Sequence, residues 1–393
     1  MRISPTRLAG LSVIAALAAG TAGCGGSSGA SDNAGSTAAG SEGTAAAAAA
    51  VDQQKIGGFG TQYEKTGSGP MVKPTVPDTP SVKTEMGRVN GNIRTYDLTA
   101  EQITQKIANF PLQRAKVWGY NGSSPGPTLV AYEGETMRVV LTNDLPDPTT
   151  IHLHGLHQPN DQDGVAGISQ PNPIPPGGKK TYTVSPGHVG TFAYHSHFQT
   201  AVQDQRGLAG MITVLPKQQH ESVKADVDVV MTLQIWGWKK NGDLVKPFGV
   251  GPGGKFPFDT INGKTGDNSG GPIEIEKGNL VRIRVYNASQ ESHAMHMHGH
   301  DIVAVSKNGH AIPPVRETTQ TVNPGDFYEL EFRADNPGNW VFHCHFPHHT
   351  ANGMAAGYHG APVGMTRVFS YKGYTPKVSP KYFSKSPSVS KTL

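Results

Sequence analysis

The segment HCHFPHHTANGM, residues 343–354, decides most of what the sequence says about fold and chemistry. It combines the Cys344 thiol with imidazoles and the Met354 thioether, and such a donor set is typical of electron-transferring blue copper sites. If the residues around Cys344 are extended, side chains alternate between two faces, so His343 and His345 point away from the Cys344 sulfur. Two metal centres would then share one strand and be connected through a short covalent path.

The second centre would draw on three further His-x-His pairs. Both imidazoles of such a pair lie on one face of an extended strand, and four pairs supply enough imidazoles for a multinuclear centre. The four pairs are His152/His154, His195/His197, His296/His298 and His343/His345. His293 lies outside these pairs, and with His349 it supplies the two imidazoles beside Cys344, which leaves Met354 as the axial ligand.

Copper is favoured over the alternatives by the whole set and not by one motif. A single His-x-His pair is more often packed or exposed to solvent than bound to a metal. Four pairs, one of them enclosing a cysteine, favour metal binding. Zinc hydrolases need neither a thiolate between two imidazoles nor the methionine that follows Cys344, so we expect copper and not zinc.

The chain repeats itself at a spacing of about 145 residues, which is the size of a domain. GTFAYHSH at 190–197 corresponds to GNWVFHCH at 338–345, and HLHG at 152–155 corresponds to HMHG at 296–299. TMRVVL at 136–141 and LVRIRV at 280–285 alternate as half-buried strands do, and 49 Gly and 30 Pro indicate many turns. We expect an all-β protein of two Greek-key β-sandwich domains.

The two copies differ in the residues that bind metal. Ser196 stands in the first copy where Cys344 stands in the second, and the first copy has no counterpart of His293 or of the His349/Met354 pair. Domain 1 should therefore hold no blue copper. Its four histidines contribute half of a multinuclear cluster, and domain 2 contributes the other half.

These motifs resemble those of the multicopper oxidases over about residues 110–370, because HLHG, YHSH, HAMHMHG and HCHFPHHTANGM match the family's copper-ligand motifs in order and spacing. The chain is similar to the two-domain laccases with type 1 copper in the second of two cupredoxin-like domains. The resemblance implies one type 1, one type 2 and two type 3 copper ions per functional unit. The implied type 1 ligands are His293, Cys344, His349 and Met354, the type 2 ligands His152 and His296, and the type 3 ligands His154, His195, His197, His298, His343 and His345.

The activity implied by this resemblance is oxidation of a small reducing substrate at type 1 copper and reduction of dioxygen to water at the trinuclear cluster. The substrate could be a phenol, an aromatic amine or a metal ion. A copper-dependent nitrite reductase also has two cupredoxin domains, but that family carries its type 1 cysteine in domain 1, where this chain has Ser196. A non-catalytic copper-binding lipoprotein, which would only carry or store copper, would need neither the cluster nor its connection to Cys344.

Asp163 is the candidate catalytic carboxylate. The Asp163-Gly164 pair follows HLHG at the place where the family carries an acid near the cluster. We expect Asp163 to orient a ligand or to relay protons, with Asp161 as the alternative. An Asp-Gly pair also forms turns without any further role.

The N-terminus predicts export. Arg2 and Arg7 precede an apolar stretch at 8–19, and Cys24 follows in a context that resembles a bacterial lipoprotein cleavage box. Thr21 stands where an apolar residue is usual, so ordinary signal cleavage and secretion is the alternative. We expect a signal peptide at 1–24, a low-complexity tether and N-terminal arm at 25–80, domain 1 at 81–216, domain 2 at 217–375 and a tail at 376–393.

Charge, cysteine content and connectivity bear on partners. The formal net charge of +4 and the lack of a basic, aromatic-interleaved patch argue against nucleic acid. With Cys24 and Cys344 as the two cysteines, no disulfide is expected and membrane contact would depend on a lipid anchor. Because each domain holds half a cluster and the connection near 215–226 is short, we expect head-to-tail assembly, and the two-domain relatives imply a homotrimer.

Overall fold

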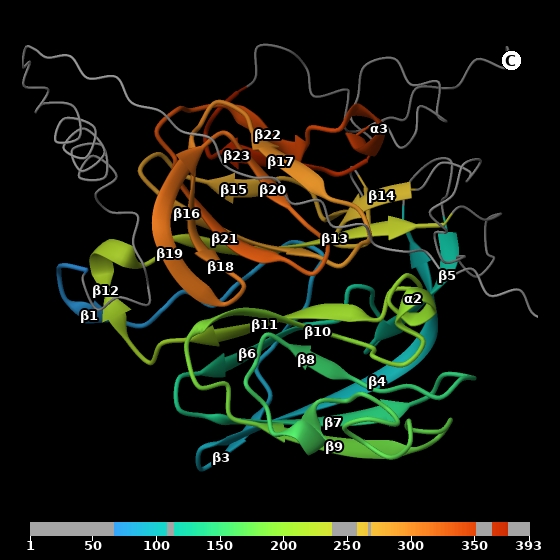
Figure 1. Cartoon of the computed structure of the whole chain (residues 1–393). Helices are drawn as coiled ribbons and strands as arrows, with labels where there is room; N and C mark the ends of the chain where they lie inside the picture. The colour runs from blue at the N-terminus through green and yellow to red at the C-terminus, as the bar shows by residue number, and fades with distance from the viewer. Residues whose placement is uncertain (1–66, 108–113, 238–257, 266–268, 351–363, 376–393) are drawn as a thin grey trace, which may run out of the picture. The chain divides into compact units, whose positions relative to one another are not determined.

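The computed structural model describes residues 67–107, 114–237, 258–265, 269–350 and 364–375, and their regular structure is almost entirely β (Figure 1). The prediction of an all-β protein is therefore confirmed. Helical turns are short, namely η1 (Asn160–Gln162), α2 (Thr200–Gln203), η2 (Glu221–Val223) and α3 (Pro347–Thr350). In the described ranges, no helix has the length and apolar character needed to span a membrane.

The first half of the fold, residues 84–215, forms two sheets around one core, in strands coloured blue to green in Figure 1. The first sheet has the order β2 (Thr84–Glu85), β6 (Thr128–Tyr132), β11 (Ala209–Leu215), β10 (Gly190–His195) and β8 (His152–His154). The second has the order β3 (Arg88–Asn90), β4 (Ile93–Lys106), β7 (Thr136–Asn143) and β9 (Lys179–Val184), with β5 (Arg114–Tyr120) also paired to β4. β7 alternates between buried and half-buried residues, as predicted.

The second half, residues 227–371, repeats this arrangement. Its first sheet has the order β14 (Phe258–Ile261), β13 (Val227–Trp236), β16 (Leu280–Asn287), β21 (Phe327–Arg333), β18 (Ile302–Lys307) and β19 (His310–Glu317). Its second sheet has the order β15 (Ile273–Ile275), β23 (Thr366–Tyr371), β22 (Asn339–Cys344), β17 (His293–Met297) and β20 (Thr319–Val322). Cys344 belongs to the apolar core of this half, because β22 ends with its side chain turned inward.

β16 is not the half-buried strand that its alternating sequence predicts, because every residue from Leu280 to Asn287 is buried. The reason is that its polar face packs against the first half of the chain. Arg284 donates hydrogen bonds at 2.7 Å to Thr191 on β10 and to Glu329 on β21, and a bidentate pair to Asp228. Buried charges therefore lie where the sequence predicted a half-buried strand with one solvated face, and Arg284 joins the two halves through Thr191.

Residues 67–80, the end of the predicted tether and N-terminal arm, are part of the fold. β1 (Met71–Val72) pairs with β12 (Gln219–His220), and the Asp78 amide donates to the Asp228 carbonyl oxygen at 2.9 Å. This segment thus lies against both the connection between the halves and β13. The predicted signal peptide with Cys24, the rest of the tether and the C-terminal tail lie outside the described residues, and the domain boundaries stay predictions.

Candidate metal centres

Cys344 lies beside two imidazoles at the end of β22, and we call His293, Cys344 and His349 the cysteine site. The Cys344 sulfur is 3.2 Å from His349 Nδ1 and 3.8 Å from His293 Nδ1, and the two Nδ1 atoms are 3.0 Å apart. All three residues are buried, and they come from β17, β22 and α3. Met354, the predicted axial ligand, lies outside the described residues.

The far sides of both imidazoles are held by hydrogen bonds. His293 Nε2 donates to the Ser289 hydroxyl at 2.7 Å, and that hydroxyl donates to Asn287 Oδ1 at 2.7 Å. His349 Nε2 donates to the Glu291 carboxylate at 3.2 Å. With the proton on Nε2, each ring presents the lone pair of Nδ1 to the sulfur. Two such lone pairs at this distance repel unless a cation lies between them, so the donor set fits a metal.

Protonation in the cysteine site also suits a metal. Burial lowers the pKa of His293 to about 3, helped by the charges of His349 and His348, so this ring is neutral at neutral pH. Burial raises the pKa of the Cys344 thiol to about 11. A thiolate in this position therefore needs a cation beside it, and thiolate with neutral imidazoles is the donor chemistry that copper prefers.

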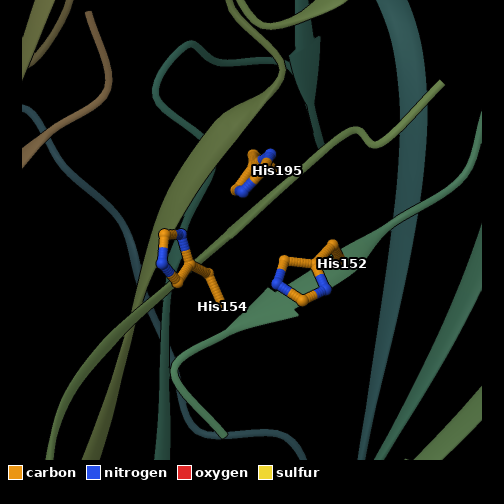
Figure 2. A group of neighbouring side chains, drawn as sticks. All are labelled: His152, His154 and His195. Atoms are coloured by element: carbon orange, nitrogen blue, oxygen red, sulfur yellow. The ribbon is translucent and has the colours of Figure 1, made fainter. Parts of the chain in front are cut away.

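The first histidine group consists of His152, His154, His195 and the neighbouring His197. Figure 2 shows the rings of His152, His154 and His195 facing one another, and their donor atoms lie within 4.8 Å of each other. The His197 ring lies 5.6 Å from that of His152. Pairing of β8 with β10 sets His195 opposite His152. Burial lowers the pKa of His154 to about 4, and its buried Nδ1 has no hydrogen-bond partner in the described part of the chain, as a ligand atom requires.

Two carboxylates orient the first histidine group. His152 Nδ1 donates to the carbonyl oxygen of Asp163 at 2.9 Å, with Asp163 Oδ1 at 3.2 Å. His195 Nδ1 lies 2.8 Å from the Ser196 carbonyl oxygen and 3.1 Å from Asp204 Oδ2. Burial alone would lower the pKa of His195, but the bond and charge of Asp204 outweigh it and the net shift is upward. The structure thus places Asp163 beside a histidine, whereas the Asp161 side chain accepts a bond from Gln162.

The second histidine group consists of His296, His298, His343 and the neighbouring His345. The Nε2 atoms of His298 and His343 are 2.9 Å apart, and the His345 ring lies 5.4 Å from that of His296. His296 Nδ1 donates to the Thr318 carbonyl oxygen, and His343 Nδ1 donates to the Cys344 carbonyl oxygen, both at 2.8 Å. His298 and His345 are exposed, so this group opens to the surface of the chain.

The two histidine groups stay apart within one chain. In the described ranges, no imidazole of the first group makes a ring contact or hydrogen bond with one of the second. The neighbours of His154 from the second half are Phe327, whose ring lies 5.5 Å away, and Gly325. A cluster that uses all eight histidines therefore needs either a rearrangement or a second copy of the chain.

The place in the first half that corresponds to the cysteine site holds a hydrogen-bond network. Thr149 stands three residues before His152, as His293 stands three residues before His296. The Ser196 and Thr149 hydroxyls both donate to Gln203 Oε1, at 2.6 and 2.7 Å. These neutral oxygens satisfy each other, and the absence of a blue copper from this half stays a prediction.

Several residues around these sites were not predicted from the sequence. Ser289, Glu291 and Asp204 hold imidazoles of the predicted ligands, yet none belongs to a histidine motif and none has a spacing that marks it. Thr149 could have been found, because the alignment of the two copies puts it opposite His293. The other three come from loops that fold back on the ligand strands.

Two stretches of the chain, residues 102–219 and 239–362, match family models that are both described as multicopper oxidase. Laccase-2 of Podospora anserina is 29% identical over 298 residues, which are 72% of this chain and 46% of the relative. Laccase-3 of Thanatephorus cucumeris is 33% identical over 242 residues, which are 56% of this chain and 41% of the relative. The chain thus spans less than half the length of these relatives.

Solved structures match over more of their length. A multicopper oxidase called mgLAC has a TM-score of 0.63 and 33% identity, and the match covers 74% of this chain and 93% of the other. The blue copper oxidase from Nitrosomonas europaea has a TM-score of 0.63 and 29% identity, with the same coverage of both chains. These similarities confirm the predicted cupredoxin-like fold.

Proposed function

This chain belongs to the multicopper oxidase family, and we propose that it is a laccase-like oxidase that passes electrons from a small reducing substrate to dioxygen and forms water. One observation carries the proposal. The Cys344 sulfur lies in the cysteine site, while His343 belongs to the second histidine group, so adjacent residues serve two centres. Family membership implies copper, and the donor sets described above fit it.

We assign a copper type to each centre from the burial and the donor atoms of its residues. The cysteine site would hold the type 1 copper through His293, Cys344 and His349, with Met354 as the proposed fourth ligand. Copper bound at the centres would supply one-electron transfer and the reduction of oxygen. The chain's own part is to keep His293, Cys344 and His349 buried and fixed, because Ser289 and Glu291 hold the rings and the surrounding core excludes water.

The histidine groups would together hold one type 2 and two type 3 copper ions. We assign the type 2 ion to His152 and His296, which occupy corresponding places in the two copies. The type 3 pair is assigned to the remaining six histidines, which are His154, His195, His197, His298, His343 and His345. Asp163 is proposed to orient His152 and to take part in proton delivery, since both its carbonyl and its carboxylate face that ring.

We propose that the cluster forms between chains, in a homotrimer. Support comes from the separation of the two histidine groups and from the exposure of His298 and His345 on the second group. A head-to-tail contact brings the first group of one chain to the second group of the next, and such contacts close into a ring when the rotation allows it. Three chains would then share three clusters.

Export and anchoring are proposed from the N-terminal sequence alone. The charged start, the apolar stretch and Cys24 support an exported protein that is held at the cell envelope by acylation, or else secreted. Detergent partitioning of the wild type against Cys24→Ala tests this. Release of the variant from membranes supports acylation, and equal solubility of both forms points to ordinary signal cleavage.

The reducing substrate is tested by oxygen uptake of the copper-loaded protein with phenols, aromatic amines, Cu(I), Fe(II) and Mn(II). Cys344→Ser serves as the control, because it keeps the histidine groups and removes the thiolate. Uptake with at least one reductant, absent in the control, supports an oxidase. Uptake with none, together with nitrite reduction by the same preparation, would replace the proposal with a nitrite reductase.

A further inference from the structure

A further group of metal-binding side chains lies on the outer side of the cysteine site. The donor atoms of Glu291, His348 and His349 all lie within 4.8 Å of one another. Glu291 comes from the segment before β17, and the two histidines belong to α3. We call these three residues the outer group, and His349 is the member that it shares with the cysteine site.

His349 connects the outer group to the buried thiol. Its Nε2 donates to the Glu291 carboxylate at 3.2 Å, and its Nδ1 lies 3.2 Å from the Cys344 sulfur. One imidazole ring therefore separates the carboxylate from the sulfur. A reductant held at Glu291 would lie next to the cysteine site without having to enter the core.

The outer group can be reached from solvent, whereas the cysteine site is sealed. His348 is exposed and the Glu291 side chain is 32% exposed, but the side chain of His349 is only 1% exposed. A small solute can thus contact Glu291 and His348 at the surface. Its electron would then have to pass through the buried ring.

The Glu291 carboxylate has no lysine or arginine as ion-pair partner in the described ranges, and its partner there is the His349 ring. That ring is neutral in the tautomer described above, because Nε2 carries the proton and Nδ1 the lone pair. The negative charge of Glu291 is therefore not cancelled by its neighbour. A carboxylate of this kind beside an imidazole attracts a cation more strongly than it attracts a neutral molecule.

Backbone hydrogen bonds hold the donors of the outer group in place. The Glu291 carbonyl oxygen accepts a bond from Asn287 Nδ2 at 2.7 Å. The His349 amide donates to the Phe346 carbonyl oxygen at 3.0 Å, which closes the turn that carries His348. The His348 ring lies 4.2 Å from that of His349. The carboxylate and the exposed imidazole are thus positioned before a ligand arrives.

We propose that Glu291 and His348 bind the reducing substrate as a divalent first-row cation such as Fe²⁺, and that His349 conducts its electron to the cysteine site. This proposal rests on the proposed oxidase function and names its substrate class. Carboxylate and imidazole donors suit Fe²⁺ and Mn²⁺, whereas Cu⁺ prefers sulfur. Two protein ligands completed by water hold a cation less firmly than the three or four of a resident metal site, which suits a substrate that must leave after oxidation.

The electrons balance with dioxygen as the oxidant. Each Fe²⁺ gives one electron to the cysteine site and leaves the outer group as Fe³⁺. Four such electrons, together with four protons, reduce one dioxygen to two waters. The protein's part is to hold the cation at Glu291 and His348 and to keep the His349 ring between that cation and the Cys344 sulfur.

The alternative is that Glu291 only holds His349 and that an aromatic reductant docks nearby. Phe346 is 41% exposed and its ring lies 6.0 Å from that of His348, so a phenol would find an aromatic neighbour. A phenol would bind through its ring and hydroxyl and would not need His348 as a metal ligand. The two possibilities therefore differ in how loss of His348 affects a cation and a neutral phenol.

The test compares oxygen uptake of the copper-loaded full chain with Fe²⁺ and with the neutral phenol guaiacol. Cys344→Ser protein gives the background rate of uncatalysed Fe²⁺ oxidation. His348→Gln and Glu291→Gln should each lower the ratio of kcat/KM for Fe²⁺ to kcat/KM for guaiacol by roughly tenfold or more. His310→Gln is the matched control, since His310 is an exposed histidine on β19, and it should keep the wild-type ratio.

A second measurement detects the cation without turnover. Zn²⁺ has no redox chemistry, and it should not displace Cu²⁺ from filled centres, because Cu²⁺ binds such donors more tightly. In calorimetric titration of the copper-loaded chain, Glu291→Gln and His348→Gln should each weaken the binding of one Zn²⁺ by roughly tenfold. The blue band should persist in both variants and so report an intact cysteine site, because glutamine at 291 can still accept the bond from His349.

The inference is overturned if the ratio and the zinc affinity stay at wild-type values in either variant, or if the wild type oxidises guaiacol but not Fe²⁺. Equal losses with both reductants in His348→Gln would also contradict it and point to docking of an aromatic reductant. Oxygen uptake by the wild type with neither reductant would instead remove the proposed oxidase function, and the electron-conducting role of His349 with it. His348→Gln guards against a folding artefact, because that side chain is exposed.

Discussion

β10 and β22 occupy the same place in the two halves, yet one ends at a hydrogen-bond network and the other at the cysteine site. His195 pairs in register with His152, just as His343 pairs with His296. The next residue differs in its surroundings. Ser196 donates to Gln203 at 2.6 Å, whereas the Cys344 sulfur faces His349 Nδ1 at 3.2 Å.

The two halves differ in the side chains that pack against the end of this strand, because β10 and β22 themselves correspond to each other. Each strand is followed by a short helix, and α2 delivers Gln203 while α3 delivers His349. Opposite them, Thr149 corresponds to His293. A duplicated sheet thus keeps its register and its outward histidines, while the inner side differs at three positions, which hold Thr149, Ser196 and Gln203 in the first half and His293, Cys344 and His349 in the second.

The largest effect is expected for Cys344→Ser. Replacing the thiolate with a hydroxyl removes the ligand that gives type 1 copper its charge-transfer band. The absorption band at a wavelength of about 600 nm should therefore vanish. Turnover should fall by at least about three orders of magnitude, as for loss of an essential catalytic group. Absorption spectra and oxygen uptake measure both effects. A variant that stays blue would contradict the assignment of Cys344.

The reciprocal change, Ser196→Cys, is the matched control. It places a thiol at the corresponding position of the first half, but its neighbours there are Thr149 and Gln203, which offer oxygen in place of imidazole nitrogen. We expect no second blue band. A second blue band would show that a cysteine on this strand is enough to form a blue copper site, without His293 and His349. The neighbouring residues would then not explain the difference between the two halves.

The next effect concerns the outward histidines, which the halves share. His152→Ala and His296→Ala should each keep the blue band and lose oxygen uptake, because the cysteine site is intact and the cluster is not. Mixing the two variants after dissociation should restore activity if clusters form between chains, since some interfaces then combine two intact groups. A mixture as inactive as its parents would place each cluster within one chain.

The sequence predicted which histidines come together in pairs, because most pairs lie on or directly beside a strand, where a two-residue spacing fixes the face. It did not predict which groups hold these imidazoles in place. Asp204 reaches His195 from the segment after α2, and Glu291 reaches His349 from the loop before β17. Such contacts depend on how loops fold back on the sheet, which no local periodicity encodes.

The wrong prediction for β16 has a similar cause. Its alternation of apolar and charged residues matches that of β7, and alternation normally indicates one solvated face. Tertiary packing covers that face in the second half only. No local pattern predicts this burial, since the carboxylates that pair with Arg282 and Arg284 lie on β13 and β21.

Because β16 is fully buried and β7 is half-buried, the same arginine-to-alanine substitution should lower the free energy of unfolding by different amounts in the two strands. Arg282→Ala should lower the free energy of unfolding by about 3–5 kcal/mol, because it leaves Glu331 buried without the guanidinium that binds it at 2.8 Å. Arg138→Ala, at the corresponding half-buried position, should cost less than about 1 kcal/mol. Denaturant unfolding measures both. Equal costs would mean that the buried Arg282–Glu331 pair stabilises the fold no more than a half-buried arginine does.

The smallest effects are expected for the carboxylates that hold the first histidine group. Asp204→Asn should lower the affinity of the histidine cluster for copper by about 10–100-fold, since the amide loses the charge that holds His195. Each ring keeps a backbone acceptor in both variants, but Asp163→Asn should have the weaker effect, because the Asp163 side chain is more exposed than that of Asp204 and water screens its charge more. Chelator competition monitored by copper content compares the two, with the blue band as internal reference for the cysteine site. An Asp163→Asn effect as large as that of Asp204→Asn would show that the Asp163 carboxylate, and not its backbone, orients His152. Slower oxygen turnover of Asp163→Asn at full copper content would support a role of Asp163 in proton delivery, because the histidines would then still hold their copper.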